Sequence, residues 1–257
     1  MLHIVIPMAG EGSRFAKAGY SLPKPLIELN GKPFFWWAVA SIAGYVSDFD
    51  LTFVALEDHV RRFGIDREIR KHFGKCDIVT LPRVLAGPVY SCLEGISNIR
   101  DSEPVIFNDC DHWFKCADLN RYISGSDADG MLFYFESSNP QYSYLIYGQD
   151  GRLKGTVEKQ VASDRAICGA YYFRNRETYI DCFRRYKDTN RYSELFMSGM
   201  YDHLLAGGKK VLDVRLDRHM DFGTPERYRE AQETMRDLSV NDIAGMENFA
   251  GREDSAC

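Results

Sequence analysis

Several features that define other classes of protein are missing from this sequence. Its 257 residues include seven cysteines, with no Cys-x-x-Cys pair and no histidine at zinc-finger spacing. An odd, scattered set of cysteines is typical of reduced thiols rather than of a disulfide framework. These absences argue against a disulfide-stabilised scaffold and against a zinc finger.

A long hydrophobic run is missing too. The most apolar stretch, residues 34–46, is 13 residues long, whereas a membrane-spanning helix needs about 20. Residues 1–7 have no basic segment and too short an apolar segment for a signal peptide, and they resemble a first strand instead. We therefore expect a cytoplasmic protein without a membrane partner.

The chain also lacks an excess of basic residues. Its formal net charge is −5 and its pI is near 5.7, so no overall basic field is present to hold a nucleic-acid backbone. We expect no nucleic-acid partner. A few Arg and Lys side chains, backbone N–H groups and a cation can still bind a triphosphate locally.

The pattern along the first half predicts an α/β fold. Short β-branched runs alternate with helical stretches, which is typical of a parallel sheet covered by helices. We expect strands and helices in alternation, with strands at 2–7, 51–56, 77–81 and 104–108 and helices near 34–44, 58–72 and 89–99. Right-handed crossovers make this a doubly wound, mainly parallel sheet.

The second half predicts an antiparallel lid inserted over this sheet. Apolar runs follow one another with little room for helices, at 131–135, 142–147, 153–158 and 167–173. Asp150-Gly151 is a hairpin signal between two of them. Further elements then follow: helices near 177–186 and 192–206, a strand at 210–216 and a helix from Pro225. We expect one domain over residues 1–237 and a C-terminal tail at 238–257.

A glycine-containing loop follows the first strand. Gly10 and Gly12 let the backbone turn sharply, so that successive N–H groups can point at phosphate oxygens. A turn chosen only for its dihedral angles is the alternative. A dinucleotide-binding loop needs a third glycine where Phe15 stands, and a P-loop needs Gly-Lys-Ser/Thr, which is absent. The predicted nucleotide-binding residues of this loop are Met8, Ala9, Gly10, Gly12 and Ser13.

Two basic residues accompany the loop. Arg14 follows the glycines directly, and Lys24 lies between two prolines that should prevent a helix and present the ammonium from a stiff turn. The motif G-x-G-S-R-F, followed by P-K-P-L, resembles the nucleoside-triphosphate/sugar-phosphate nucleotidyltransferase family. The resemblance covers roughly residues 2–232 and implies a Rossmann-like fold of nucleotidyltransferase or GT-A type. It also implies that Arg14 and Lys24 are catalytic and neutralise the triphosphate and the charge that develops at the α-phosphorus.

The resemblance further implies a division of labour within the domain. Residues 1–128 would bind the nucleoside triphosphate and residues 129–237 the phosphorylated acceptor. Gly87 lies in a small-residue segment that resembles the base-binding loop of the family. No side chain there shows which base is recognised, so CTP, UTP and dTTP stay open.

Carboxylates follow the strand at 104–108. Asp109 and Asp111 stand where open α/β sheets bind ligands, although a helix cap near Asp118 is an alternative role. By resemblance, Asp111 matches one metal carboxylate of the family. Asp221, in the segment D-x-G-T-P-E, matches the other, and the implied cofactor is Mg²⁺ or Mn²⁺. Thr224 before Pro225 is explained by helix capping alone.

A second pair of motifs indicates the residues that bind the acceptor. Glu158-Lys159 and the later Gly169 resemble the family's E-K and G-x-Y-x-F, which implies that Glu158 binds acceptor hydroxyls and Lys159 the acceptor phosphate. By itself a Glu-Lys pair is usually a solvated strand end. Gln160 and Ser143 depart from the family, where proline and glycine are frequent. Both a sugar 1-phosphate and a phosphocholine-like ester therefore remain candidate acceptors.

The sequence thus predicts a nucleotidyltransferase that releases pyrophosphate and supplies an activated precursor for capsule or surface polysaccharide. Its partners would be a nucleoside triphosphate and a small phosphorylated metabolite, and a homo-oligomer is compatible with this. A GT-A type glycosyltransferase that uses Asp109-Cys110-Asp111 is the enzymatic alternative. A degenerate subunit that binds a nucleotide without turnover is the other.

Overall fold

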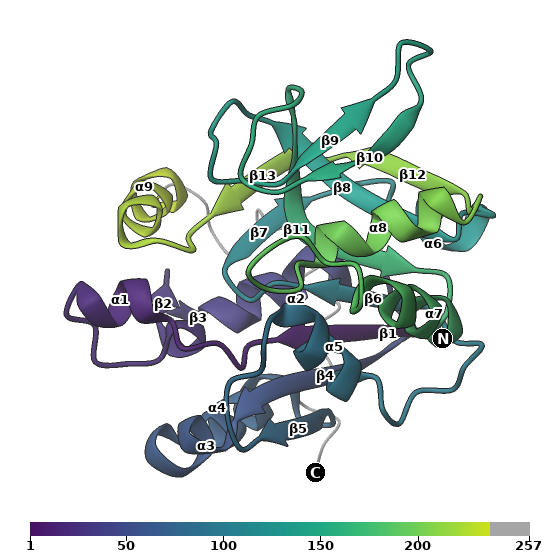
Figure 1. The fold of residues 1–257 in the computed structure, drawn as a ribbon. Coiled ribbons are helices and arrows are strands. Elements are labelled where there is room, and N and C mark those ends of the chain that lie inside the picture. Colours follow the sequence, from purple (N-terminus) through teal and green to yellow (C-terminus); the bar gives the residue numbers. More distant parts are fainter. Residues whose placement is uncertain (237–257) are drawn as a thin grey trace.

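The computed structural model describes residues 1–236, so the predicted tail at 238–257 lies outside the described residues. Within that part of the chain, a nine-stranded mixed sheet runs through the molecule with helices on both sides (Figure 1). Its parallel part has the order β6-β1-β4-β5, as a doubly wound sheet requires. These strands are β1 (Leu2–Pro7), β4 (Phe49–Leu56), β5 (Asp77–Leu81) and β6 (Val105–Asn108).

The second half adds antiparallel strands, as predicted, but among the described residues they extend the same nine-stranded sheet and do not form a lid over it. β11 (Arg165–Phe173) pairs with β6 in the antiparallel sense and thereby joins the two halves into one sheet. The remaining strands are β8 (Gly130–Glu136), β9 (Tyr144–Tyr147), β10 (Leu153–Val157) and β12 (Val211–Arg215). β9 and β10 form a hairpin, and Gly151 donates to the carbonyl of Gly148 in its turn, which confirms the Asp150-Gly151 signal.

Two short ribbons were not predicted. β7 (His112–Lys115) pairs with β13 (Arg218–Asp221), and β2 (Glu28–Leu29) pairs with β3 (Lys32–Pro33). Four-residue strands that pair across about a hundred residues leave little periodicity in the sequence. The first ribbon is nevertheless central to the site, because it sets Asp221 opposite His112.

The helices include two short ones, α1 and α6, that were not in the predicted set, and most of the others differ from the predicted ones at their ends. They are α1 (Ser13–Lys17), α2 (Phe34–Ala43), α3 (Glu57–Phe63), α4 (Ile65–Phe73), α5 (Pro88–Gly95), α6 (Leu119–Gly125), α7 (Arg176–Tyr186), α8 (Met197–Ala206) and α9 (Pro225–Met235). The single helix expected at 58–72 was wrong, because Gly64 has a left-handed φ of 62° and divides it in two. The helix expected at 192–206 begins only at Met197, and the one expected at 89–99 ends at Gly95.

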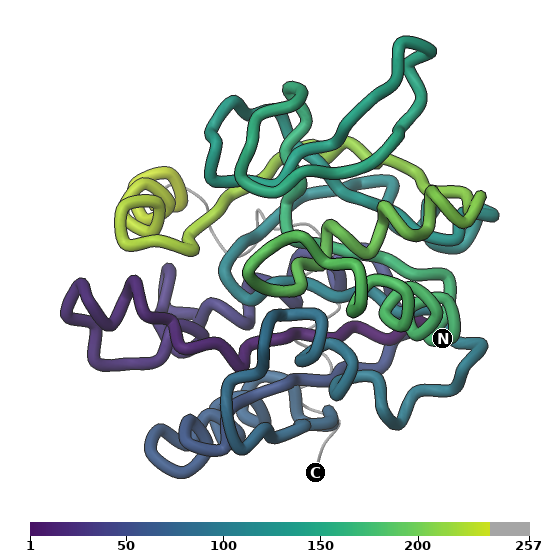
Figure 2. Tube along the Cα trace, in the orientation of Figure 1, coloured from purple at the N-terminus to yellow at the C-terminus, as the bar shows by residue number. Residues whose placement is uncertain are grey.

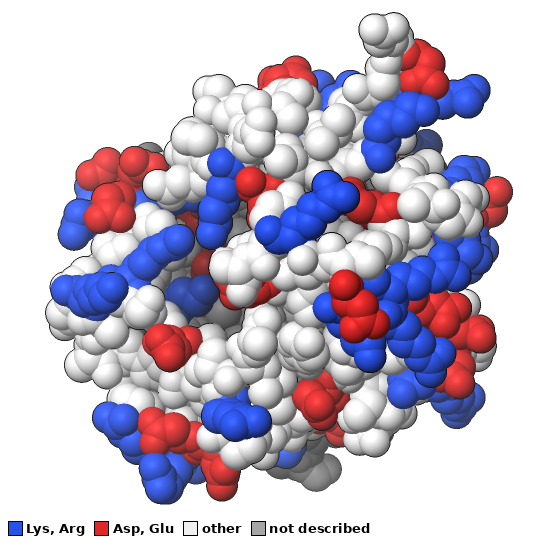
Figure 3. Space-filling model, viewed as in Figure 1, with Lys and Arg blue, Asp and Glu red and all other residues white. Residues whose placement is uncertain are grey.

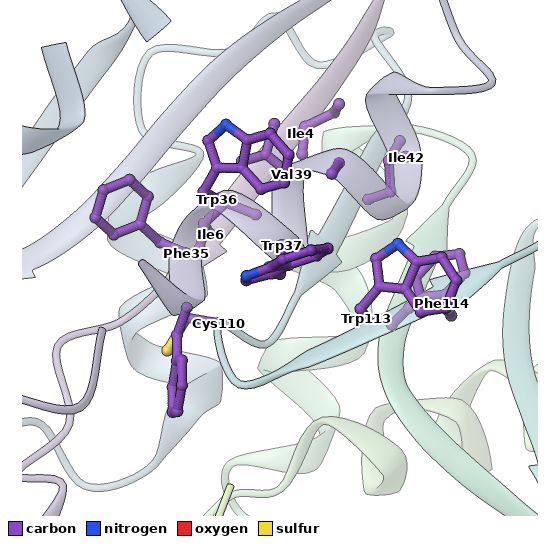
Figure 4. Close-up of a cluster of buried hydrophobic side chains, with 14 of the residues drawn as sticks. Ile4, Ile6, Phe35, Trp36, Trp37, Val39, Ile42, Cys110, Trp113 and Phe114 are labelled. Carbon is purple, nitrogen blue, oxygen red and sulfur yellow. The ribbon is translucent and has the colours of Figure 1, made fainter. Parts of the chain in front are cut away.

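Helix α2 anchors the site from behind. All ten of its residues are buried, and Figure 4 shows Trp36 and Trp37 packed beside β1. The amide Nδ2 of Asn108, at the end of β6, donates to the carbonyl of Ala38 at 2.8 Å. The hydroxyl of Ser41 accepts from the backbone N–H of Phe114 at 3.0 Å. Both strands that flank the Asp109–Asp111 turn are therefore tied to one buried helix.

The last described helix returns to the glycine loop. Figure 2 shows α9 beside α1, although the two are about 200 residues apart in sequence. The hydroxyl of Tyr228 donates to the carbonyl of Glu28 at 2.7 Å, and its ring lies 6.3 Å from that of Phe15. Within residues 1–236, no helix is both long and apolar enough to span a membrane.

Candidate active site

A cavity of about 320 Å³ opens where the two halves of the sheet meet. Figure 3 shows the surface hollowed on this face, with basic and acidic side chains gathered around the hollow. Six of the predicted site residues line this cavity: Arg14, Asp111, Glu158, Lys159, Gly169 and Asp221. Residues predicted separately as catalytic, metal-binding and acceptor-binding thus share one space.

Lys24 reaches this cavity through Asp111. Its ammonium donates to Asp111 Oδ2 at 2.9 Å, and the two side chains are 26% and 21% exposed. Burial acts to lower the pKa of Lys24, but the charge and hydrogen bond of Asp111, with smaller contributions from its neighbours, together outweigh burial and the pKa lies above its usual value. Lys24 therefore stays charged at the edge of the site.

The backbone around Lys24 corrects one expectation. A single 3-10 turn spans Lys24–Leu26, whereas we expected the prolines to prevent any helix. Pro25 is tolerated because the first N–H groups of a helix have no partner within it. Gly12 has a φ of 61°, and a Cβ there would lie 3.1 Å from the Cβ of Lys24, so the glycine allows the lysine turn to pack against the loop.

The two predicted metal carboxylates converge on Gly223. A Cβ on Gly223 would overlap Asp111 Oδ2 and would lie 3.1 Å from Asp221 Oδ1. The backbone N–H of Phe222 donates to the carbonyl of Asp111 at 3.0 Å, which fixes the two segments together. The space that a side chain would fill at Gly223 is thus faced by two carboxylates.

This arrangement fits a divalent cation that is shared with a substrate. Residues 1–236 contain no group of three or more His, Cys, Asp or Glu side chains able to hold a metal by themselves. Mg²⁺ is commonly held by one or two carboxylates, with substrate phosphates and water as further ligands. The oxygen donors of Asp111 and Asp221 suit that chemistry.

Comparison with known proteins identifies the family. The family model for the MobA-like NTP transferase domain matches residues 4–167. The chain belongs to this family. The matched region includes the glycine loop, Lys24, Asp111 and Glu158-Lys159, whereas Gly169 and Asp221 lie beyond it. The fold and the nucleotidyltransferase class predicted from the sequence are confirmed.

Solved structures agree with this fold. A nucleoside-diphosphate-sugar pyrophosphorylase from Vibrio cholerae RC9 superposes with a TM-score of 0.77 at 23% identity, over 90% of this chain and 99% of that one. A protein described as a glucose-1-phosphate thymidylyltransferase from Bacillus anthracis gives a TM-score of 0.72 at 14% identity, over 93% and 97% of the two chains. The comparison with curated proteins gave no match.

Asp109 also lines the cavity of this NTP transferase, beside Gly169. A Cβ on Gly169, whose φ is 95°, would lie 2.8 Å from Asp109 Oδ2. Burial, followed by the charge of Asp111, raises the pKa of Asp109. Burial also acts to raise the pKa of Asp111, but Lys24 outweighs it and the pKa falls. The pKa values of the two carboxyl groups are therefore shifted in opposite directions.

Glu158, which the resemblance assigned to the acceptor, has a hydrogen-bond partner within the protein. Ser143, which stands where many family members have glycine, donates its hydroxyl to both carboxylate oxygens of Glu158, at 2.6 Å for Oε2. Burial raises the pKa of Glu158. Lys159 adopts a left-handed φ of 53°, and its ammonium lies 5.1 Å from the ring centre of Phe196. The serine thus occupies the carboxylate that the resemblance assigned to acceptor hydroxyls.

The predicted nucleotide-binding residues lie outside the cavity lining. They are Met8, Ala9, Gly10, Gly12, Ser13 and Gly87. Gly87 has a φ of 125°, and a Cβ there would lie 2.8 Å from the backbone N and O of Leu195. Packing against the loop before α8 is therefore sufficient to explain this glycine, while its neighbour Pro88 lines the cavity.

Sequence reasoning missed several cavity residues. Arg227 forms an ion pair with Asp221, and the hydroxyl of Tyr142 donates to the same carboxylate at 2.9 Å. Burial first, and then Asp221, raises the pKa of Tyr142 above its usual value. One signal was available: Arg227 stands three residues after the cap Thr224, where a capping box has an acid. A basic residue at that position indicates a partner other than the helix end.

Two histidines complete the wall behind the carboxylates. Burial lowers the pKa of His112 to about 4 and that of His219 to about 3, so both rings are neutral at pH 7. The ring of His219 stacks on Phe135 with centroids 3.9 Å apart. These rings pack as aromatic side chains and add no positive charge to the site.

Proposed function

We propose that this NTP transferase moves a nucleoside monophosphate from CTP, UTP or dTTP to a small phosphorylated acceptor and releases pyrophosphate. The observation that carries the proposal is the convergence of Asp111 and Asp221 on Gly223, with Lys24 bound to Asp111 in the same site. The names of the two structural neighbours support a sugar 1-phosphate as acceptor. The Ser143–Glu158 contact keeps a phosphocholine-like ester as the second candidate.

The reaction requires little covalent chemistry from the protein. An acceptor phosphate oxygen forms a bond to the α-phosphorus, while the bond from that phosphorus to the bridging oxygen breaks and its electron pair leaves with pyrophosphate. No general base is needed, because the attacking group is already an anion. The difficulty is to bring two anions together, which positioning and charge neutralisation overcome.

The roles follow from the positions of the side chains. Arg14 and Lys24 would neutralise the triphosphate and the charge that develops at the α-phosphorus. Asp111 and Asp221 would hold Mg²⁺ or Mn²⁺, which when bound masks phosphate charge. Lys159 would contact the acceptor phosphate, with Glu158 and Gly169 beside the rest of the acceptor. The product would serve as an activated precursor for capsule or surface polysaccharide.

The glycosyltransferase alternative needs both carboxylates of Asp109-Cys110-Asp111 on one cation. Both line the cavity, but Asp109 Oδ2 lies beside Gly169, whereas Asp111 Oδ2 lies beside Gly223 together with Asp221. The family match also favours nucleotidyl transfer. We therefore retain the nucleotidyltransferase.

A substrate matrix tests this function directly. CTP, UTP, dTTP, GTP and ATP are each combined with sugar 1-phosphates, phosphocholine and related esters, and pyrophosphate release is measured with Mg²⁺. We expect one nucleotide and one acceptor class to stand out. Consumption of a nucleotide sugar without any pyrophosphate from the matrix would instead establish the glycosyltransferase.

A further inference from the structure

Among the described residues that line the cavity, Arg227 is the cation for which neither the sequence motifs nor the proposed function provides a role. It lies in the first turn of α9, where its backbone N–H donates to the hydroxyl of the cap Thr224 at 3.3 Å. Its side chain and that of Asp221 are each 15% exposed. The guanidinium lies 4.3 Å from the ring centre of Tyr142. The helix start and the aromatic ring together hold this cation at the cavity wall.

Asp221 has several hydrogen-bond donors, whereas its partner Arg227 has a donor that is not used. Asp221 accepts from Arg227, from the hydroxyl of Tyr142 and from the backbone N–H of Gly223. By contrast, Nη2 of Arg227 is buried and has no hydrogen-bond partner among the described residues. A buried guanidinium with an unused donor and a flat, rigid fork is suited to a phosphate group.

Each of the two proposed metal carboxylates forms an ion pair with a basic side chain of the protein. Asp111 is paired with Lys24, and Asp221 with Arg227. A divalent cation on both carboxylates would leave Lys24 and Arg227 with weakened counter-ions in a poorly exposed site. An unpaired buried charge is strongly unfavourable, so each needs a new anion. The triphosphate can provide one of them beside Lys24.

The position of Arg227 indicates the second anion. Its aromatic neighbour Tyr142 directly precedes Ser143, which binds Glu158 on the acceptor side. The charge that Arg227 faces is therefore that of the acceptor.

We propose that Arg227 binds the acceptor's phosphate, exchanging its bond to Asp221 for bonds to phosphate oxygens when the cation and the substrates enter. This inference rests on the proposed function and adds a specific phosphate-binding residue to it. It also explains a basic residue at a helix position that usually favours an acid. Because the fork is stacked and held on two sides, an ammonium cannot reproduce it.

Steady-state kinetics provide the first test. At saturating nucleotide, Arg227→Ala should raise the KM for the acceptor on the order of 10- to 100-fold, as expected for loss of a hydrogen-bonded charge. The KM for the nucleotide should stay within about twofold, since Arg227 faces the other substrate. Arg227→Lys should not rescue acceptor binding. Arg229→Ala, an exposed arginine on the same helix, is the matched control and should behave like the parent protein.

A second test needs no turnover. Mn²⁺ binding is followed by electron paramagnetic resonance on the full chain without substrates. Arg227→Ala should bind Mn²⁺ several-fold more tightly than both the parent and Arg229→Ala, because Asp221 loses its competing cation. Arg227→Gln, which keeps a hydrogen-bond donor but no charge, serves as a second variant if the alanine variant unfolds, and should give the same result.

The outcomes separate this inference from the proposed function. An acceptor KM within twofold of the parent value, or an equal rise for both substrates, would overturn the role of Arg227. Mn²⁺ affinity that is unchanged or weaker in the variant would also overturn it. If the parent releases no pyrophosphate with any substrate pair, the proposed function fails. Tighter Mn²⁺ binding by the variant would still support the exchange at Asp221.

Discussion

At the residue scale, neighbouring carboxylates have different surroundings. Asp109 and Asp111 are two residues apart, yet one lies against Gly169 and the other is bound to Lys24. The pKa of the first is raised and that of the second lowered. From their spacing in the sequence, both are candidate cation ligands. Only their contacts in the folded protein distinguish them.

The first prediction concerns the carboxylates on Gly223. Asp111→Asn and Asp221→Asn should each lower kcat by at least about 10²-fold, because each removes a negative charge that we propose holds the cation that masks phosphate charge. Excess EDTA should abolish pyrophosphate release by the parent, and Mg²⁺ should restore it. Asp188→Asn, an exposed carboxylate, is the control.

Loss of activity in Asp109→Asn with full activity in Asp111→Asn would mean that the wrong carboxylate was assigned. Circular dichroism should show that each variant is folded. Activity of either Asp111→Asn or Asp221→Asn in excess EDTA would rule out the metal assignment.

The second prediction concerns the basic residues of the glycine loop. Arg14→Ala and Lys24→Ala should lower kcat by about 10²- to 10³-fold, since each removes a group that stabilises developing charge. Nucleotide affinity, measured by isothermal titration calorimetry, should fall much less. Lys24→Arg should not rescue, because a planar fork does not replace a compact ammonium beside Asp111.

Lys17→Ala, on the exposed face of α1, is the matched control for these variants. Normal turnover in both Arg14→Ala and Lys24→Ala would show that the loop is only a turn. The nucleotidyltransferase mechanism proposed here would then be incorrect.

At the scale of elements, buried α2 holds the turn that carries the carboxylates. Asn108 is fully buried, and its amide joins the end of β6 to the carbonyl of Ala38. The same helix binds Phe114 through Ser41, just beyond the turn. The positions of Asp109 and Asp111 are therefore set by a helix whose sequence shows only that it is apolar.

The third prediction tests this support. Asn108→Ala should lower the free energy of unfolding by about 1–3 kcal/mol, because a buried hydrogen bond to the carbonyl of Ala38 is lost together with the packing of the side chain. Urea unfolding measures this loss. Asn120→Ala, an exposed asparagine in α6, should change stability by no more than about 0.5 kcal/mol. A loss in Asn108→Ala as small as that of the control would mean that α2 does not secure the turn.

At the scale of the whole molecule, the cavity joins two halves that the sequence predicts separately. The antiparallel pairing of β11 with β6 brings the strand that contains Gly169 beside the strand that ends at Asn108. The ribbon of β7 and β13 brings Asp221 to the same edge. Residues predicted for the metal and for the acceptor are thus brought to one cavity.

The fourth prediction separates the two halves. Lys159→Ala should raise the KM for the acceptor by about 10-fold or more and leave that for the nucleotide nearly unchanged, since it lies on the acceptor side. Lys154→Ala, an exposed lysine in β10, is the control. Equal effects on the two substrates, or none, would show that Glu158-Lys159 is a solvated strand end.

The sequence by itself determined the class of fold and the family. Period-two and period-3.6 patterns are local, so β1, β4, β5 and α2 were predicted nearly to the residue. The glycine loop, Lys24 and Glu158-Lys159 carried the resemblance that the family match confirmed. The break in the helix at Gly64 was not predicted, because a glycine within a helical pattern is compatible either with a continuous helix or with a divided one.

Only the tertiary structure decided which side chains meet. The pairing of Arg227 with Asp221, the contact of Ser143 with Glu158 and the packing of Leu195 against Gly87 join segments that no local pattern connects. Such contacts depend on β-strand register and on the ribbon of β7 with β13, which form between residues far apart in the chain. The physical reason is that a periodic pattern specifies only which face of a helix or strand is buried. Which other element packs against that face is selected by the packing of the whole core.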